Sequence, residues 1–356
     1  MQIGEPDFDT PRNICEAGIR AINDGKTHYA PSGGIPVARE AVAQYVSTTR
    51  GLKVGAENAI IMPGAKPVIY CAMIALINEG DEIIVPNPGY PTYRSLTRFF
   101  GAKAVPVKLS EANDFRFSLD DFASLITPRT KMVILNSPQN PTGGILTQQD
   151  LEGVYALAKK HDLWIMSDEI YSRIVYGIDF RSVASIPGAM DRTIIVDGMS
   201  KTYAMTGWRL GYGVMPKKLA DYMFTLAINN FSSTATFSQY ALIEALQGSQ
   251  AEIDKMVAEF KRRRDVIVDG LNQIDGISCL RPEGAFYVFP NITKTGLSSN
   301  EFANMMLEQA GVACLSGTAF GEHGEGYVRF SYANSVENIR EALSRIKKIL
   351  VGVVRP

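Results

Sequence analysis

Short apolar runs alternate with amphipathic segments from about residue 57 to residue 215. Each run has the length of one strand, and the segments between the runs repeat their apolar positions every three to four residues, which predicts helices. Strands that are apolar at nearly every position are buried on both faces, as in a mainly parallel sheet between two layers of helices. The predicted strands are DEIIVP (81–86), AKAVPVKL (102–109), TKMVILN (130–136), LWIMSD (163–168), TIIVDG (193–198) and WRLGYGV (208–214).

Beyond about residue 235 the pattern changes to longer amphipathic segments with two further apolar runs. Helices of this length beside a few strands predict a second, smaller α+β domain. The segments are the predicted helices EIDKMVAEFKRRRDVIVDGL (252–271) and SVENIREALSRIKKIL (335–350) and the apolar runs GAFYVFPNI (284–292) and GYVRFSYA (326–333).

The length of the chain agrees with this division. Its 356 residues, 46% of them hydrophobic, suit one large domain and one smaller domain. We therefore expect an α/β protein whose large domain, residues 28–240, holds a doubly wound parallel sheet flanked by helices. Residues 1–27 and 241–356 are expected to form the small α+β domain.

Charge and cysteine usage exclude several classes of function. The formal net charge is −1, so nothing favours nucleic acid as a partner, and the basic run KRRR (261–264) is interpreted as a solvated helix face. No apolar stretch reaches the roughly 18 residues of a membrane span. The four cysteines and three histidines are scattered, which indicates free thiols in a reducing compartment, the cytoplasm, and no metal site.

Reactive side chains follow three neighbouring predicted strands. In an open parallel sheet, ligands bind beyond the carboxyl ends of the strands. Asn140 follows TKMVILN, Asp168 and Tyr171 follow LWIM, and Lys201 follows TIIVDG, with Arg209 eight residues later. Taken singly, each residue could serve as a helix cap, a turn residue or a solvated loop residue. Together, at successive strand ends, they predict a site.

This set of side chains matches the needs of pyridoxal phosphate catalysis. An amine bonds the aldehyde of the cofactor, and a carboxylate holds the pyridine nitrogen protonated so that the ring withdraws electrons. Amide and phenol donors address the phenolate oxygen of the ring. A hydroxyl and a guanidinium suit the phosphate, and Ser200 and Arg209 are the candidates for these roles.

Seven ordered motifs extend this interpretation, and through them the sequence resembles the class I and II aminotransferases of the fold-type I pyridoxal phosphate enzymes. Any one of the motifs would be weak, but their order along most of the chain is specific. They are GEPDFDTP (4–11), THYAPSGGIPVAREAVA (27–43), PNPGYPTY (86–93), NSPQNPTGG (136–144), SDEIY (167–171), SKTYAMTGWRLGY (200–212) and GYVRFSYA (326–333).

The resemblance implies a role at the cofactor ring for five positions. Lys201 is implied to be the Schiff-base lysine and the proton shuttle, and Asp168 the partner of the pyridine nitrogen. Asn140 and Tyr171 are implied to bind the ring oxygen, and Tyr90 to stack on the ring face.

The resemblance also implies residues that hold the phosphate and the substrate. The phosphate cradle is implied to consist of Ser200, Arg209, the backbone at Gly64, Ala65 and Lys66, and Tyr29 from the other subunit of a homodimer. The substrate α-carboxylate is implied to be held by Gly4 and Arg329, and Asn140 is a further substrate-binding candidate. Lys66 lies beside the expected cradle, so it could instead meet the side-chain carboxylate of aspartate or glutamate.

Two positions depart from the family pattern. Many relatives carry Ser or Thr three residues before the lysine, where this chain has Gly198, so one phosphate hydroxyl is absent or comes from elsewhere. The sequence also begins almost at GEPDF, whereas relatives have an N-terminal arm there, which puts the contact of that arm with the partner subunit in question.

The expected reaction is ping-pong transfer of an amino group from an L-amino acid to a 2-oxo acid, with 2-oxoglutarate as the expected acceptor. A β-lyase or a decarboxylase on the same fold shares the motifs and is the alternative. A ligand-sensing regulator would need a DNA-binding module, and neither a helix-turn-helix pattern nor a basic excess is present. A nicotinamide enzyme is disfavoured because no GxGxxG motif follows a strand.

Overall fold

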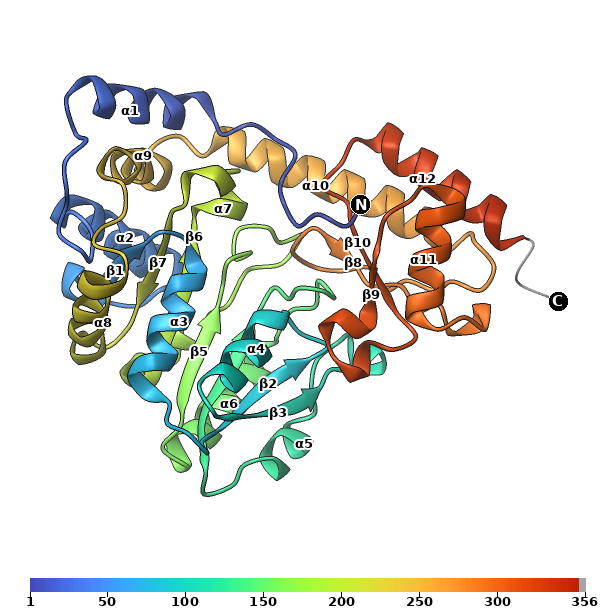
Figure 1. Cartoon of the computed structure of the whole chain (residues 1–356), viewed down its shortest axis with the longest axis horizontal. Coiled ribbons are helices and arrows are strands. Elements are labelled where there is room, and N and C mark those ends of the chain that lie inside the picture. The colour runs from blue at the N-terminus through green and yellow to red at the C-terminus, as the bar shows by residue number, and fades with distance from the viewer. Residues whose placement is uncertain (352–356) are drawn as a thin grey trace.

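The computed structural model describes residues 1–351, and within them a seven-stranded sheet forms the centre of the larger part of the molecule (Figure 1). The strand order is β1-β7-β6-β5-β4-β2-β3. The five strands from β6 to β3 run parallel, and β7 runs antiparallel to both of its neighbours. The strands are β1 (Ala59–Met62), β2 (Glu82–Asn87), β3 (Lys103–Lys108), β4 (Thr130–Asn136), β5 (Trp164–Asp168), β6 (Thr193–Gly198) and β7 (Gly211–Val214).

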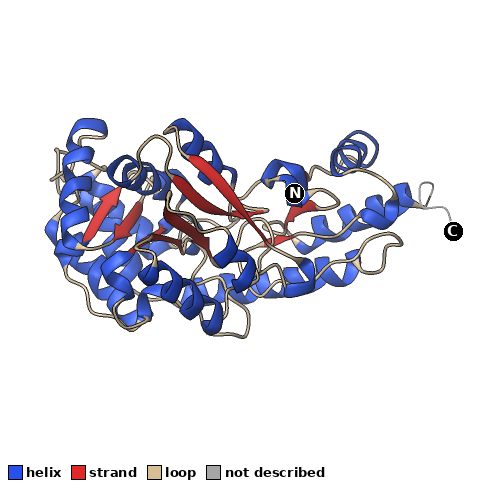
Figure 2. Cartoon of the chain, turned by 90° about the horizontal axis from the view of Figure 1, so that it is seen from below, coloured by secondary structure: helices blue, strands red, loops and turns tan. Residues whose placement is uncertain are grey.

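Helices cover both faces of this sheet (Figure 2). Successive residues of a strand point to opposite faces, so Met132 and Ile134 of β4 pack in one apolar cluster while Val133 and Leu135 pack in another. The expected doubly wound α/β architecture is therefore confirmed. The helices up to residue 247 are α1 (Arg12–Asn23), α2 (Pro36–Arg50), α3 (Ala65–Leu76), α4 (Pro91–Phe99), α5 (Leu119–Ser124), α6 (Gln148–Lys160), α7 (Met199–Thr202), α8 (Lys217–Asn230) and α9 (Thr236–Gln247).

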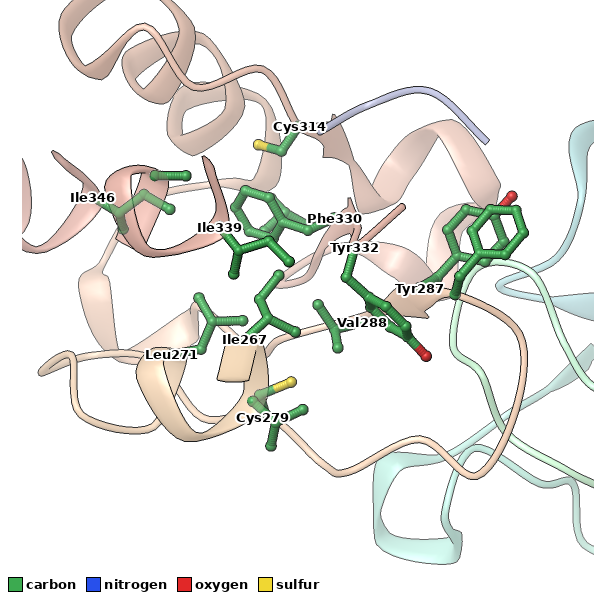
Figure 3. Packing of buried hydrophobic residues seen from close by; sticks show 14 of the residues in the cluster. Ile267, Leu271, Cys279, Tyr287, Val288, Cys314, Phe330, Tyr332, Ile339 and Ile346 are labelled. Carbon is green, nitrogen blue, oxygen red and sulfur yellow. The ribbon is translucent and has the colours of Figure 1, made fainter. Parts of the chain in front are cut away.

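A smaller sheet, ordered β8-β10-β9, lies at the other end of the molecule (Figure 1). Figure 3 shows its core, in which Ile267 of the long helix α10 and Ile339 of the last helix pack near Val288 and Phe330 of the sheet. The elements are β8 (Tyr287–Val288), β9 (Leu315–Ser316), β10 (Val328–Ser331), α10 (Ala251–Leu271), α11 (Ser299–Ala310) and α12 (Val336–Leu350).

All six predicted strands of the large sheet are present, and a seventh was missed. Strand β1 has only four residues, AIIM, all buried, which is too short to stand out as an apolar run. The run WRLGYGV is a strand only from Gly211 onward, because a 3₁₀ turn covers 206–208 and Arg209 takes a left-handed conformation with φ 53°.

The prediction that KRRR is a solvated helix face is wrong for two of its four residues. Lys261 and Arg262 are exposed, but Arg263 and Arg264 are buried. Arg263 forms a 2.6 Å ion pair with Asp7, and its guanidinium lies 4.7 Å from the ring centre of Phe8. Helix α10 thereby fixes the N-terminal segment, a contact that no pattern within the helix could indicate.

The division into residues 28–240 and 1–27 with 241–356 stays a proposal, and residues 352–356 of it lie outside the described residues. Helix α1 packs against α9, and Ile14 of α1 shares an apolar cluster with Leu242 of α9. In the part of the chain that the structure describes, no helix combines the length and the apolar character needed to cross a membrane.

Candidate active site

A cavity of about 500 Å³ opens at the carboxyl ends of the parallel strands, where the sequence predicted a site. The N-terminal segment and strand β10 of the small sheet close it from the other side. Most of the predicted site residues line this cavity, namely Gly4, Ala65, Lys66, Tyr90, Asn140, Asp168, Tyr171, Ser200, Lys201, Arg209 and Arg329.

The amine of Lys201 and the carboxylate of Asp168 enter the cavity from adjacent strands. Asp168 is the last residue of β5, and Lys201 lies on the short helix α7 that follows β6. Burial lowers the pKa of the Lys201 amine to about 8 and raises the pKa of the Asp168 carboxyl to about 6. The amine donates a hydrogen bond of 2.5 Å to the carbonyl oxygen of Gly4.

Asp168 has a buried phenol partner that sequence analysis missed. The hydroxyl of Tyr93 donates to Oδ2 of Asp168 at 2.6 Å, and the backbone N–H of Ile170 donates to Oδ1 at 3.2 Å. Tyr93 lies three residues after Tyr90 at the start of α4, so both rings are on one side of the helix, 5.6 Å apart and edge to face. That spacing within the PGYPTY motif was the available signal.

Arg329 is buried, and its guanidinium is only partly satisfied. Nη1 donates to Oδ1 of Asn140 at 2.9 Å, and Nη2 donates to the carbonyl oxygen of Gln2 at 2.6 Å. Its Nε atom has no hydrogen-bond partner among residues 1–351. A buried donor without a partner is costly, so this side of the cavity is suited to an anion.

Two tyrosines link the large and small sheets at the cavity. The hydroxyl groups of Tyr171 and Tyr287 are 2.9 Å apart, and the Arg329 guanidinium lies 4.4 Å from the ring centre of Tyr287. Tyr287 belongs to the GAFYVFPNI run, where the apolar pattern gave no sign that one ring would face a cavity. Asn136, which donates to the carbonyl oxygen of Asp168 at 3.1 Å, was also missed, although it ends strand β4.

The start of α3 and Arg209 form one corner of the cavity. Gly64 caps this twelve-residue helix with φ +105°, and a Cβ built there would lie 2.5 Å from Nη2 of Arg209. The positive φ is what favours glycine here, and the absence of a side chain leaves room for the guanidinium beside the helix terminus. The free backbone N–H groups of the first turn, the guanidinium and Ser200 together make a corner suited to an anion.

Gly198 cannot simply regain the missing hydroxyl. A Cβ at this position would lie 2.9 Å from the Cα atom of Gly211 and 3.0 Å from the carbonyl oxygen of Leu210, both backbone atoms of the neighbouring segment. Strands β6 and β7 are paired at these two glycines. The absence of a side chain at 198 is thus required by the close approach of the strands.

Tyr29 does not reach the cavity of its own chain. It is 91% exposed, the most exposed large hydrophobic residue in the described part of the chain, and its surroundings are Ser233 and Phe237 rather than the predicted cradle. Lys66 does line the cavity, and its amine lies 5.6 Å from the ring centre of Tyr90.

Comparisons with known proteins agree with this geometry. The family model described as aminotransferase class I and II matches residues 1–346. The chain is 41% identical to an aromatic-amino-acid aminotransferase of Thermococcus litoralis over 98% of this chain and 91% of that protein. It is 40% identical to an aspartate aminotransferase of Pyrococcus abyssi with the same two coverages.

The solved structures that resemble this chain are also aminotransferases. An aromatic aminotransferase from Pyrococcus horikoshii superposes with a TM-score of 0.97 and 38% identity, covering 99% of this chain and 95% of that one. An aspartate aminotransferase from Thermus thermophilus, solved with maleate, gives a TM-score of 0.94 and 38% identity, covering 98% and 90%.

The chain belongs to the aminotransferase class I and II family. It is an aminotransferase, an enzyme that transfers amino groups, and the alternative of a β-lyase or decarboxylase is not favoured. Members of this family use pyridoxal phosphate.

Proposed function

We propose that this chain moves an amino group from an acidic L-amino acid to a 2-oxo acid, such as 2-oxoglutarate, with pyridoxal 5′-phosphate bound in the cavity. The observation that carries the proposal is the conjunction of an amine of lowered pKa, a buried carboxylate and a half-satisfied buried guanidinium in one cavity.

The residues present fit the cofactor. Lys201 supplies the amine, Asp168 the carboxylate for the ring nitrogen, Asn140 and Tyr171 the donors for the ring oxygen, and Tyr90 an aromatic face. The corner formed by the start of α3, Arg209 and Ser200 suits a phosphate dianion, and the missing side chain at Gly64 lets the guanidinium lie close to the helix terminus. When bound, the cofactor supplies an aldehyde that exchanges with amino groups and a ring that accepts electrons from the substrate α-carbon.

The side chains of the protein perform the other parts of the reaction. Asp168 would accept a charge-assisted hydrogen bond from the ring nitrogen of the cofactor and so keep that nitrogen protonated. Lys201, once its amine is free and neutral, takes the proton from the substrate α-carbon; its pKa of about 8 suits a base at neutral pH. Arg329, whose Nε has no hydrogen-bond partner among the described residues, binds the α-carboxylate, and Gly4 lines the same cavity. These contacts fix the α-carbon near the amine.

The preference for an acidic donor is supported by Lys66. An ammonium at the first turn of a helix is unfavourable next to the positive end of the dipole unless an anion is close. A dicarboxylate held by Arg329 and Lys66 would be bound at both ends. The aspartate aminotransferase names of several relatives support this donor, while the aromatic aminotransferase names keep an aromatic donor as the second candidate.

The active unit is proposed to be a homodimer with shared sites. Tyr29 is exposed, and the half-exposed Ile19 and Ile22 of α1 line an open groove of about 880 Å³ that also includes Arg209. A second copy of the chain over this groove would cover the apolar side chains and bring Tyr29 toward the phosphate corner of the partner. The four free thiols support the cytoplasm as the proposed location.

The decisive experiment combines covalent labelling with half-reactions. Borohydride reduction of the enzyme loaded with pyridoxal 5′-phosphate, followed by peptide mapping, should place the pyridoxyl group on Lys201. A panel of single amino acids should then convert the bound cofactor to its pyridoxamine form, fastest with aspartate or glutamate. A label on another lysine, or release of ammonia or carbon dioxide without the pyridoxamine form, would end the proposal.

A further inference from the structure

A buried ion cluster lies directly behind the candidate site and takes no part in the chemistry described so far. It consists of Arg50, the last residue of α2, with Glu169 and Asp197. Nε of Arg50 is 2.9 Å from Oε2 of Glu169, and Nη2 is 2.6 Å from Oδ2 of Asp197. The three side chains are only 1–3% exposed, so the interaction is shielded from water.

The two carboxylates of the cluster are fixed to the strand ends that carry the site. Glu169 is the residue after Asp168, and its backbone N–H donates to the carbonyl oxygen of Val196 in β6 at 2.8 Å. Asp197 is four residues before Lys201, and its Oδ1 accepts from the N–H of Gly198 at 2.7 Å. After these residues the first segment continues through the SDEIY motif and the second continues into α7.

The cluster is held rigidly. Ser172 accepts from Arg50 at 2.9 Å and donates to Asp197, and Tyr212 also donates to Asp197 at 3.1 Å. Two serines, Ser167 and Ser182, donate to the free oxygen of Glu169. The Arg50 guanidinium also lies near two aromatic rings, 5.2 Å from the ring centre of Phe180 and 5.7 Å from that of Tyr45.

A contribution to the stability of the fold does not explain why this cluster is present. Burying two carboxylates and one cation costs desolvation energy, and apolar replacements of buried ion pairs are often neutral or stabilising. The charges also do not balance, because one cation faces two carboxylates, with Asp168 as a third close by. What an apolar cluster could not provide is the planar fork of an arginine, which bonds two separate anions in a fixed geometry.

We propose that Arg50 is a positioning residue for the transfer reaction, joining the strand end that carries Asp168 to the strand end that carries Lys201. This inference rests on the proposed function. Arg50 does not touch the cavity; it acts through Glu169 and Asp197 and sets the separation between the carboxylate and the amine. A displacement of about 1 Å between reacting groups is enough to cost a large part of the rate.

The test compares two forms of the cofactor on the full chain stripped of cofactor. Pyridoxal 5′-phosphate needs the bond to Lys201 as well as the contact to Asp168, whereas pyridoxamine 5′-phosphate has no aldehyde and cannot form that bond. The ratio of their dissociation constants therefore reports the fit of Lys201 to Asp168. Weakening of the fold alone would reduce both affinities and leave the ratio unchanged.

The variants are Arg50→Lys, whose single ammonium cannot bond both anions with the geometry of the fork, and Glu169→Gln, which removes the charge from one link and leaves Arg50 paired with Asp197. We expect both to lower the preference for the aldehyde form about tenfold, the effect of one lost charge-assisted contact. Lys201→Ala cannot form the bond to the aldehyde, so it should show no preference for the aldehyde form and sets the lower limit of the ratio.

Arg264→Lys is the matched control, because Arg264 is also a buried arginine beside an aromatic ring, 4.8 Å from the centre of Tyr176. Its partners are Asp265 and the carbonyl oxygen of Pro282, so it does not join the strand ends that carry Asp168 and Lys201. It should keep the wild-type ratio. An unchanged ratio in either folded variant, or an equal drop in the control, would overturn the role of Arg50. If the wild-type chain itself shows no label on Lys201, the proposed function fails instead.

Discussion

The hydroxyl of Tyr93 lies 2.6 Å from Oδ2 of Asp168, so a buried phenol is hydrogen-bonded to the carboxylate proposed to hold the ring nitrogen. Burial raises the pKa of Asp168 to about 6, and the hydrogen bond from Tyr93 opposes that rise. A donor to the charged form of a carboxyl favours ionisation. Tyr93 therefore helps to keep Asp168 ionised at neutral pH, as the proposed role of this carboxylate requires.

Tyr93→Phe removes this donor without changing the ring. We expect the rate of the half-reaction at pH 7 to fall by about tenfold to a hundredfold, the effect of one hydrogen bond to a charged group. The acidic limb of the pH–rate profile should also move to higher pH. The control is Tyr176→Phe, which removes a buried hydroxyl bonded to Ala285 and Tyr332 outside the cavity. Equal profiles for the two variants would contradict this role of Tyr93.

Asp168 should give the cofactor-free protein a measurable pH dependence of stability. Its pKa in the fold, about 6, is above its ordinary value of 3.8, so the folded state binds the proton more tightly. The resulting contribution of Asp168 to the free energy of unfolding is present below pH ~4 and is lost as the pH rises through ~6. Asp168→Asn lacks this dependence.

The free energy of unfolding of Asp168→Asn, relative to that of the wild type, should thus increase by up to about 3 kcal/mol between pH 4 and pH 7. Urea unfolding of both proteins at each pH measures this difference. Asp197, whose pKa burial also raises to about 6, is present in both proteins and contributes equally. A difference that stays constant or decreases with pH would show that Asp168 is not held in a desolvated position.

Lys66 should distinguish acidic donors from neutral ones. Lys66→Ala removes a single ammonium near the cavity, so kcat/KM for aspartate or glutamate should fall about tenfold to a hundredfold. The values for alanine and phenylalanine should change little. Steady-state kinetics with all four donors give the comparison. An equal loss for every donor would instead assign Lys66 to the phosphate of the cofactor.

Tyr29 should act in the site of the partner subunit. Tyr29→Phe and Lys201→Ala are each expected to reduce activity, and a mixture allowed to exchange subunits should recover activity, because one site of each hybrid dimer then has both residues. Activity assays before and after exchange, with light scattering for the assembly state, provide the test. Full activity in a monomer would contradict the shared site.

Much of the fold was predictable because the central strands are buried on both faces, so their apolar runs stand out from the helical pattern. The same patterns located Asn140, Asp168 and Lys201 at strand ends, and the structure brings them to one cavity. What the sequence could not reveal depends on partners far along the chain. Tyr93 is 75 positions from Asp168, and Arg50 is 119 positions from Glu169.

The exposure of a run of charged residues is also hard to predict, because it too depends on partners far along the chain. The basic run of α10 looks uniform in sequence, yet the helix turns Arg263 toward Asp7 while Arg262 faces solvent. Periodicity predicts that a helix forms and which face is apolar. It does not predict that a cation on the buried side will meet an acid 256 positions away.

The cavity takes its lining from Ile3 near one end of the sequence and from Arg329 near the other, and the helix that completes the core beneath β10 ends at Leu350. During synthesis on the ribosome, the large sheet can therefore assemble long before the site exists. Because polypeptides emerge from their N-terminus onward, Arg329 joins the lining only after Asp168 and Lys201 have been synthesised. The complete lining of the cavity consequently requires residues from both the large sheet and the small sheet.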